Sequence, residues 1–273
     1  MKYMTFNSSC SYAGIANMLE QYGIDTSDRE IALEMKLPYL FDYQDGVYLS
    51  GPMLQKAEWF DIYLNPIGFQ LIEKKISAAK IVDYLKEQKT AMLGIKMGNA
   101  GKHAVVYKGM ESNELVFLNN KREDEDSSCE IRFTEEELRQ NVETEVVVAT
   151  LQPINPRKIC ILDKLESSIV VLQENLSEVL ELCGKEVAPE VLRSKLNTLF
   201  RPLFLDGITM LNLIGETEIS DEFSKMQGEL LRVLRQDITE GILLKDYISM
   251  DKLRASVQKY MELIKVEIEK LEV

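Results

Sequence analysis

Two side chains in this sequence can carry nucleophilic chemistry. Cys10 precedes apolar residues at helical spacing, and Ser8 or Ser9 can cap the helix, so Cys10 falls in its expected first turn. Free backbone N–H groups and the positive end of the helix dipole favour a thiolate at such a position. His103 is the single histidine of the chain and opens an expected strand. The thiol therefore has one candidate imidazole base.

A third residue can orient the imidazole. The strand that ends at Asn120 follows the His103 strand across a short turn, and antiparallel neighbours bring the start of one strand beside the end of the next. Asn120, or Asn119 as the alternative one residue earlier, can therefore accept a hydrogen bond from the ring and fix its tautomer. Cys10, His103 and Asn120 form a candidate triad, although each residue alone is more typical of a core or turn position.

Three stretches around these residues carry a resemblance to a known superfamily. The stretches are Ser9-Cys10-Ser11-Tyr12-Ala13, Gly101-Lys102-His103-Ala104-Val105-Val106 and Val116-Phe117-Leu118-Asn119-Asn120. They resemble the papain-like cysteine peptidases that process bacteriocin leader peptides, and more closely the N-terminal domain of the butirosin biosynthesis protein H family. The resemblance covers roughly the first 150 residues. It implies a Cys10 nucleophile, a His103 base and an orienting Asn120.

The sequence departs from the peptidase pattern around the nucleophile. Those peptidases usually carry Cys-Gly-Pro where this chain has Cys10-Ser11-Tyr12, and Met4 stands where their oxyanion-stabilising glutamine is expected. The nearest amide is Asn7, which is a candidate oxyanion donor together with the Cys10 backbone N–H. These departures weaken the prediction of a peptidase reaction more than the prediction of a papain-like fold.

Periodicity predicts helices and strands that would position these residues. The expected helices of the first part span 10–22, 27–35, 52–59, 77–88 and 135–141. The expected strands span 61–64, 91–96, 103–109, 115–120, 131–133 and 145–151, with a turn at 98–101. Between residues 91 and 133 this pattern is typical of an antiparallel meander.

Aromatic residues without helical spacing follow the second helix. Tyr39, Phe41 and Tyr43 lie in this irregular stretch, and Trp59 follows it. These four side chains are candidate walls of a substrate cleft that accepts an apolar or flat acyl group. A surface loop with some of its aromatic residues buried is an equally good interpretation.

The chain changes character after Pro153 and Pro156. Beyond them the β pattern nearly disappears, and expected helices span 162–183, 189–200, 206–214, 220–236 and 250–272. The apolar stripe of the last helix is typical of a bundle core. We therefore expect an α+β papain-like domain over residues 1–153, with its nucleophile helix packed on an antiparallel sheet, followed by an all-α helical domain over residues 154–273.

Composition narrows the class of protein. The 273 residues carry a net charge of −13, which argues against a nucleic-acid or anionic-membrane partner. The sequence shows no signal peptide and no membrane span, and its four scattered cysteines are typical of reduced thiols in a cytoplasmic protein. One histidine and isolated cysteines provide no metal site, and no cofactor is implied.

The leading hypothesis is cysteine-dependent acyl transfer on an amide or a thioester. The substrate would be a peptide or an acyl group on a carrier protein, within peptide or secondary-metabolite biosynthesis. An amine acceptor would make the protein an acyltransferase, and water would make it a peptidase or amidase. The alternative is a catalytically degenerate papain-like domain that binds a peptide or a carrier. A further expectation is homodimerisation through the helical domain.

Overall fold

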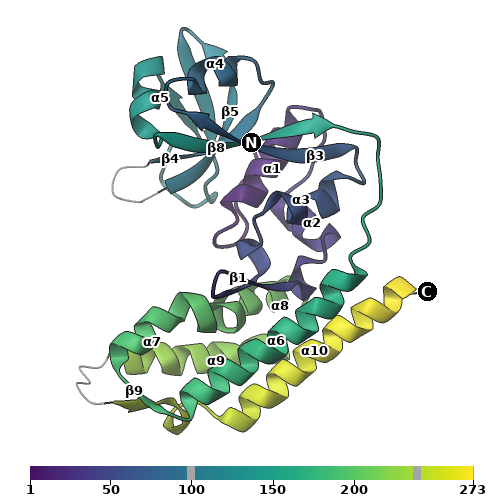
Figure 1. Ribbon diagram of the computed structural model, residues 1–273, viewed down its shortest axis with the longest axis vertical. Helices are drawn as coiled ribbons and strands as arrows, with labels where there is room; N and C mark the ends of the chain where they lie inside the picture. Colours follow the sequence, from purple (N-terminus) through teal and green to yellow (C-terminus); the bar gives the residue numbers. More distant parts are fainter. Residues whose placement is uncertain (97–101, 236–240, 273) are drawn as a thin grey trace. The chain divides into compact units, whose positions relative to one another are not determined.

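A computed structural model describes residues 1–96, 102–235 and 241–272 of the chain (Figure 1). The chain divides into two compact units. The first unit combines Met1–Met35 with Gln55–Ile159, and the second combines Lys36–Leu54 with Cys160–Val273. The segment Lys36–Leu54 lies within the domain expected over residues 1–153, yet it packs with the helical unit. The expected turn at residues 98–101 lies outside the described residues.

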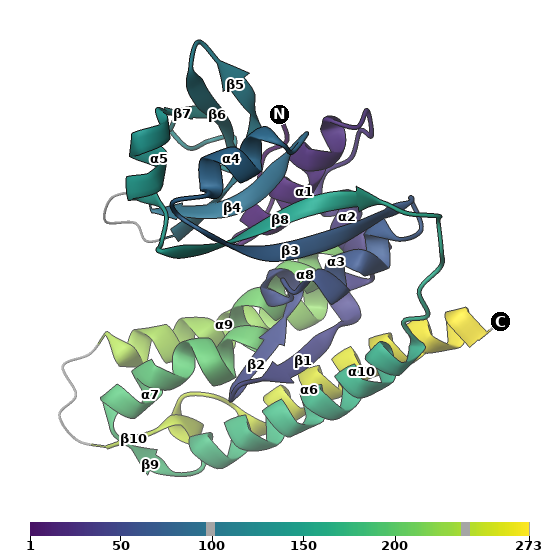
Figure 2. The ribbon, with the colours of Figure 1, turned by 45° about the horizontal axis from the view of Figure 1, so that its top comes forward.

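The first unit is built on a six-stranded antiparallel sheet. Its strands are β3 (Phe69–Ser77), β4 (Ala91–Lys96), β5 (Lys102–Glu111), β6 (Glu114–Asn119), β7 (Glu130–Phe133) and β8 (Glu145–Pro153). Their order is β3-β8-β4-β5-β6-β7, so β4 to β7 form the expected meander. Strands β3 and β8 pair along their whole lengths (Figure 2).

Helices cover both faces of this sheet. Helices α4 (Ile81–Lys86) and α5 (Glu135–Asn141) cover one face, where Leu85 and Leu138 join Val105 in a buried apolar cluster. Helix α1 (Cys10–Glu20) packs against β4 and β5. The expected α+β class, with an N-terminal helix packed on an antiparallel sheet, is confirmed. Helices α2 (Asp28–Glu34) and α3 (Ala57–Leu64) complete the unit.

Local signals explain where several elements begin. Thr134 accepts a hydrogen bond from the Glu137 backbone N–H while the Glu137 carboxylate accepts one from the Thr134 backbone N–H, and this capping box starts α5 where expected. The strand expected at residues 61–64 is wrong, because these residues belong to α3 and bury Ile62 and Leu64. The helix expected from residue 77 starts at Ile81 instead, since Ser77 still pairs in β3.

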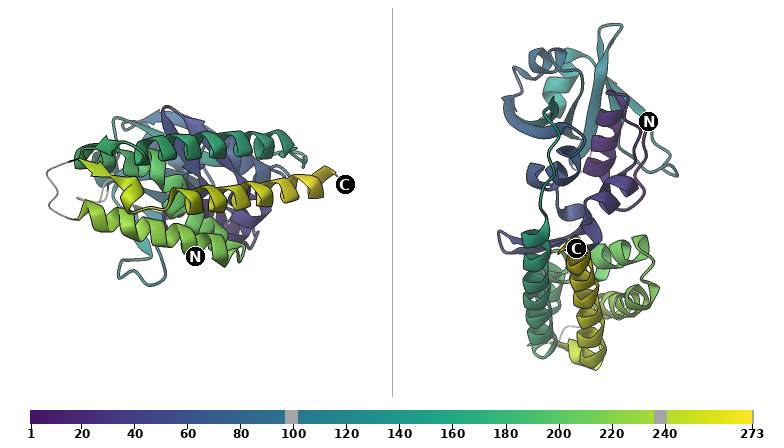
Figure 3. Two further views of the ribbon diagram at one scale, coloured as in Figure 1. Left: turned by 90° about the horizontal axis from the view of Figure 1, so that it is seen from below. Right: turned by 90° about the vertical axis from the view of Figure 1, so that its right-hand side faces the viewer.

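The second unit is mainly helical. Its α-helices are α6 (Leu162–Cys183), α7 (Pro189–Lys195), α8 (Ile208–Leu213), α9 (Thr217–Leu234) and α10 (Met250–Glu272), and α6 and α10 lie side by side (Figure 3). Two π-helical stretches, Leu196–Phe200 and Pro202–Gly207, connect α7 to α8. The apolar stripe of α10 is buried from Leu253 to Ile264, as expected for a bundle core.

Two small sheets accompany these helices. Strands β1 (Phe41–Gln44) and β2 (Val47–Ser50) form a hairpin, and β9 (Glu186–Val187) pairs with β10 (Ile242–Leu243). The hairpin turn at Asp45 and Gly46 has positive φ at both residues, as a tight two-residue turn requires. Among the described residues, no helix combines the length and the apolar character needed to cross a bilayer.

Long-range contacts explain why Lys36–Leu54 belongs to the helical unit. The Phe41 backbone N–H donates to the buried Ser168 hydroxyl on α6 at 2.9 Å. The Tyr260 hydroxyl on α10 donates to the Pro38 carbonyl at 2.7 Å, and its ring meets Phe41 edge-on. These contacts bury Phe41 between two helices that are more than 120 residues away in the sequence.

Candidate functional site

Cys10 is the first residue of α1, and its side chain is partly exposed. Ser9 is the N-cap residue of α1, but its side chain makes no capping hydrogen bond. The Ser9 hydroxyl instead donates to the Phe6 carbonyl at 2.7 Å and to the Asp28 carboxylate at 2.8 Å. The thiol therefore sits at a helix N-terminus that the Ser9 side chain does not cap, in the turn whose backbone N–H groups have no intrahelical acceptors.

Asp28 holds the loop that precedes the thiol. Its side chain is 1% exposed and accepts hydrogen bonds from the Thr5 backbone N–H at 2.7 Å, the Thr5 hydroxyl and the Ser9 hydroxyl. Three donors converge on one carboxylate, so residues 5 to 9 are fixed relative to α2. Sequence reasoning missed Asp28, whose partners lie 19 and 23 residues away.

A glutamine that sequence reasoning also missed lies beside the thiol-bearing turn. Gln55 Nε2 donates to the Ser8 carbonyl, and the Ser11 hydroxyl donates to Gln55 Oε1, both at 3.4 Å. The predicted oxyanion donor Asn7 is exposed, and its Oδ1 accepts from the Arg122 guanidinium at 3.4 Å. Gln55 is therefore the side-chain amide that contacts both sides of the Cys10 position.

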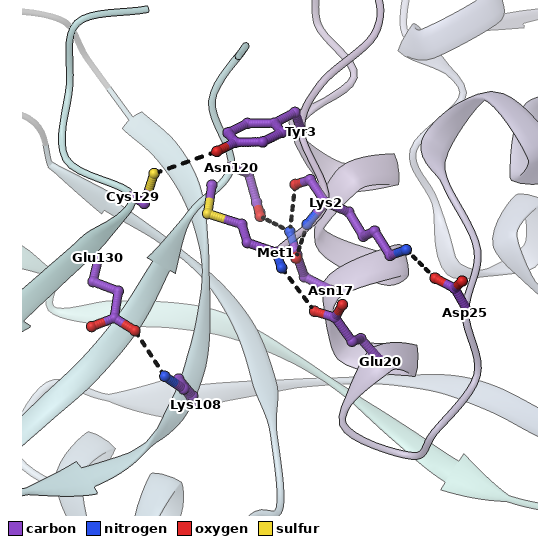
Figure 4. Close-up of polar contacts among 10 residues, drawn as sticks. All are labelled: Met1, Lys2, Tyr3, Asn17, Glu20, Asp25, Lys108, Asn120, Cys129 and Glu130. Carbon is purple, nitrogen blue, oxygen red and sulfur yellow. Dashed lines mark hydrogen bonds and ion pairs between the residues drawn. The ribbon is translucent and has the colours of Figure 1, made fainter.

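Asn120 is completely buried and contacts α1. Its Oδ1 accepts from Asn17 Nδ2 on α1, and its Nδ2 donates to the Ala104 carbonyl on β5, both at 3.0 Å. Figure 4 shows Asn17 between Asn120 and the backbone of Lys2, to which Asn17 makes two further hydrogen bonds. The Asn120 amide thus joins α1 to Ala104, the residue next to His103.

The face of α1 that meets Asn120 also carries Cys10. Cys10, Gly14 and Asn17 share one face because they are four and three residues apart. A Cβ added to Gly14 would lie 2.9 Å from Asn120 Nδ2 and 2.4 Å from Met92 Sδ, so only glycine permits this close approach. Cys10 lies one helical turn further along, about 6 Å from Gly14.

His103 is the second residue of β5 and pairs with Ile95 on β4. Its Nε2 is buried and has no hydrogen-bond partner among the described residues. Within the same part of the chain, no hydrogen bond joins His103 to Cys10 or to Asn120. His103 Nε2 therefore has an unsatisfied hydrogen-bonding capacity, and the histidine lies on β5, one of the strands against which α1 packs.

Strand alternation separates the two candidate asparagines. Asn119 pairs with Val105, and His103 lies two residues before Val105, so His103 and Asn119 share a face of the sheet. Asn120 lies on the other face, toward α1. Asn119 Nδ2 donates to the Ser128 carbonyl at 2.9 Å. Of the predicted residues, the structure brings Asn120 into contact with α1 and places Asn119 on the same face of the sheet as His103.

The aromatic residues proposed as cleft walls occupy different places. Trp59 is 4% exposed in the first unit, and Phe41 is 2% exposed in the second, so both are core side chains rather than open cleft walls. Tyr39 is partly buried in the second unit. Tyr43 is 48% exposed on the β1–β2 hairpin. A local sequence pattern does not distinguish buried from exposed aromatic residues here, because contacts with residues distant in the sequence determine which side chains are buried.

The four cysteines carry free thiols in different surroundings. Cys129 and Cys160 are exposed, and Cys129 Sγ lies 3.7 Å from the Tyr3 hydroxyl (Figure 4). Burial raises the pKa of the Cys183 thiol to about 12, so this thiol is inert at neutral pH. Across the described ranges, no group of three or more His, Cys, Asp or Glu side chains is arranged to hold a metal ion.

No family model and no curated protein matches this chain. Among solved structures, the chain is similar to the peptidase domain of Streptococcus ComA, a bi-functional ABC transporter involved in quorum sensing. The identity is 16% and the TM-score 0.39, over 55% of this chain and 96% of that one. It is also similar to a C39-like peptidase from Bacillus anthracis, at 12% identity and a TM-score of 0.34, over 54% and 90% of the two chains. Neither similarity assigns a family.

Proposed function

We propose that this protein catalyses cysteine-dependent acyl transfer on an amide or a thioester. The observation that carries the proposal is the setting of Cys10, a partly exposed thiol that is the first residue of α1. Asp28 fixes the preceding loop, and the Gln55 amide contacts the residues on either side. A positioned thiol with a side-chain amide and the backbone N–H groups of a helix first turn beside it is suited to acyl chemistry.

The reaction begins with attack of the Cys10 sulfur on the acyl carbon. The thiol proton passes to His103 Nε2, and negative charge develops on the carbonyl oxygen. Gln55 Nε2 and the backbone N–H groups of the first turn of α1 stabilise that oxyanion. When the intermediate collapses, the leaving amine or thiol takes the proton from His103. Water or an amine then attacks the thioester carbon and gives a proton to His103. The carbon–sulfur bond breaks, the acyl group leaves as an acid or an amide, and His103 returns the proton to the Cys10 sulfur.

The histidine must reach the thiol for this mechanism. No hydrogen bond joins Cys10 and His103 among the described residues, and His103 lies on the Val105 face of β5, so the mechanism requires the imidazole to turn toward Cys10 when substrate binds. Asn119, which shares the face of His103, is then the orienting residue, and Asn120 is a positioning residue that couples α1 to β5. A peptide or carrier-bound acyl group is the proposed substrate.

The proposal predicts an acyl-enzyme on Cys10. With the small thioester S-acetyl-N-acetylcysteamine, mass spectrometry of rapidly quenched samples should find one acetyl group on the Cys10 peptide. Cys10→Ala should abolish it, and Cys160→Ala, which removes an exposed thiol, should not. Loss of the oxyanion donor in Gln55→Ala should slow acetylation by about 100-fold. Equal acetylation of Cys10 and the exposed cysteines would contradict the proposal.

A second candidate function is binding without catalysis. Strand alternation places His103 on the face of Val105 rather than on the α1 face of the sheet, and this observation favours it. The unit would then hold a peptide or a carrier protein, and Cys10 would be a helix-end side chain without a chemical role. In that case Cys10→Ala would leave partner binding unchanged, and Cys10 would acetylate no faster than Cys160.

A further inference from the structure

The second unit contains a hollow that the acyl chemistry does not use. It has a volume of about 530 Å³ and lies between the β1–β2 hairpin and helix α6. Tyr43 and Tyr48 line it from the hairpin, and Val170, Glu174 and Glu178 line it from the helix. All of these residues belong to the second unit.

The aromatic wall of the hollow is a pair of tyrosine rings. Tyr43 and Tyr48 are direct partners across the hairpin, with ring centroids 4.7 Å apart and planes inclined at 49°. Tyr48 is 5% exposed and anchors the pair, while Tyr43 is 48% exposed and remains accessible. Val170 is 56% exposed beside them. The hollow therefore presents exposed aromatic and apolar surface to solvent.

The opposite wall is negatively charged. Glu174 and Glu178 are one helical turn apart on α6, so their carboxylates project from the same face. The Tyr48 hydroxyl donates to Glu178 Oε1 at 2.7 Å. Burial raises the pKa of Tyr48, and the hydrogen bond and charge of Glu178 and the charge of Glu174 raise it further.

No basic side chain among the described residues neutralises this wall. Neither Glu174 nor Glu178 forms an ion pair there, although Glu181 on the same helix is paired with Lys185. An electron-rich ring face attracts a cation within about 6 Å, and unpaired carboxylates add to this attraction. The two walls are thus complementary to one kind of ligand, a positively charged group with an apolar body.

We propose that this hollow binds an organic cation, either a small quaternary or primary amine or the side chain of a lysine or arginine in a peptide. The cation lies over the Tyr43 ring, with the carboxylates of Glu174 and Glu178 beside it. The apolar body of the ligand contacts Val170. The hydrogen bond from Tyr48 holds Glu178 in position to face the bound charge.

Titration calorimetry of the full chain with choline tests the charge requirement. Its neutral isostere 3,3-dimethylbutan-1-ol has the same shape without the charge, and we expect it to bind at least about tenfold more weakly. Nα-acetyl-lysine amide, which keeps its side-chain ammonium group, serves as the second cationic probe. Tighter binding of choline indicates a free quaternary amine, and tighter binding of the lysine derivative indicates a peptide side chain.

Variants of the hollow localise the binding. Tyr43→Ala and Glu174→Gln should each weaken binding of the preferred cation by about tenfold. The first removes the aromatic ring and the second removes a negative charge, and both residues are exposed. The matched control Glu181→Gln changes an exposed glutamate of the same helix outside the hollow, and binding should be unchanged. The proposal is overturned if neither cation binds, if the isostere binds as well as choline, or if Glu181→Gln weakens binding as much as Glu174→Gln.

Discussion

Replacement of Asp28 with alanine is expected to lower the free energy of unfolding by about 3 kcal/mol. The carboxylate is buried and accepts hydrogen bonds from the Thr5 backbone N–H, the Thr5 hydroxyl and the Ser9 hydroxyl. Removing it leaves these donors without their acceptor in a water-poor site, which costs more than the loss of exposed hydrogen bonds. Urea unfolding followed by circular dichroism measures the change.

Asp25→Ala is the matched control for this experiment. Asp25 lies three residues earlier and pairs with Lys2, but its side chain is 90% exposed. Water replaces such a partner readily, so we expect no measurable loss of stability. If Asp28→Ala and Asp25→Ala unfold at the same urea concentration, Asp28 does not hold the loop before Cys10.

Replacement of Asn120 with aspartate is expected to destabilise the protein in a pH-dependent way. The substitution keeps the shape but puts an oxygen where Nδ2 donates to the Ala104 carbonyl. A carboxylate there faces another acceptor in a fully buried site, so the loss at pH 7 is about 2–3 kcal/mol. The protonated acid can still donate to the carbonyl.

The direction of the pH dependence follows from linkage. Burial raises the pKa of the new acid in the folded state above its unfolded value of about 3.9. Between these two values the folded state binds more protons, so stability relative to the parent protein falls as pH rises. Urea unfolding of variant and parent at pH 4 and pH 7 should show the difference growing with pH. Asn113→Asp, in an exposed turn, should show no such growth; equal behaviour of the two variants would contradict the buried role of Asn120.

Local sequence signals predicted many elements of both units. The capping residue Thr134 marked the start of α5, and periodicity gave the bounds of α6 and α10. The meander followed from alternation and turn residues. These features depend on neighbours within a few residues, which is the range that periodicity and capping describe.

The remaining features depend on contacts between distant residues. Gln55 contacts Ser8 and Ser11 across more than 40 residues, so no local pattern pointed to it as the amide beside the thiol. Phe41 is a core residue because its backbone N–H donates to the Ser168 hydroxyl and its ring packs edge-on against Tyr260. The choice between Asn119 and Asn120 needs the strand register, since a shift of one residue moves a side chain to the other face.

We expect Cys10 to be the reactive thiol of this protein. The most direct measurement compares the rates at which iodoacetamide alkylates the four cysteines at neutral pH, resolved by mass spectrometry of peptides. Cys10 should react faster than the more exposed Cys129 and Cys160, His103→Ala should remove this advantage, and the buried Cys183 should react last. Alkylation of Cys10 no faster than that of Cys129 and Cys160 would contradict it.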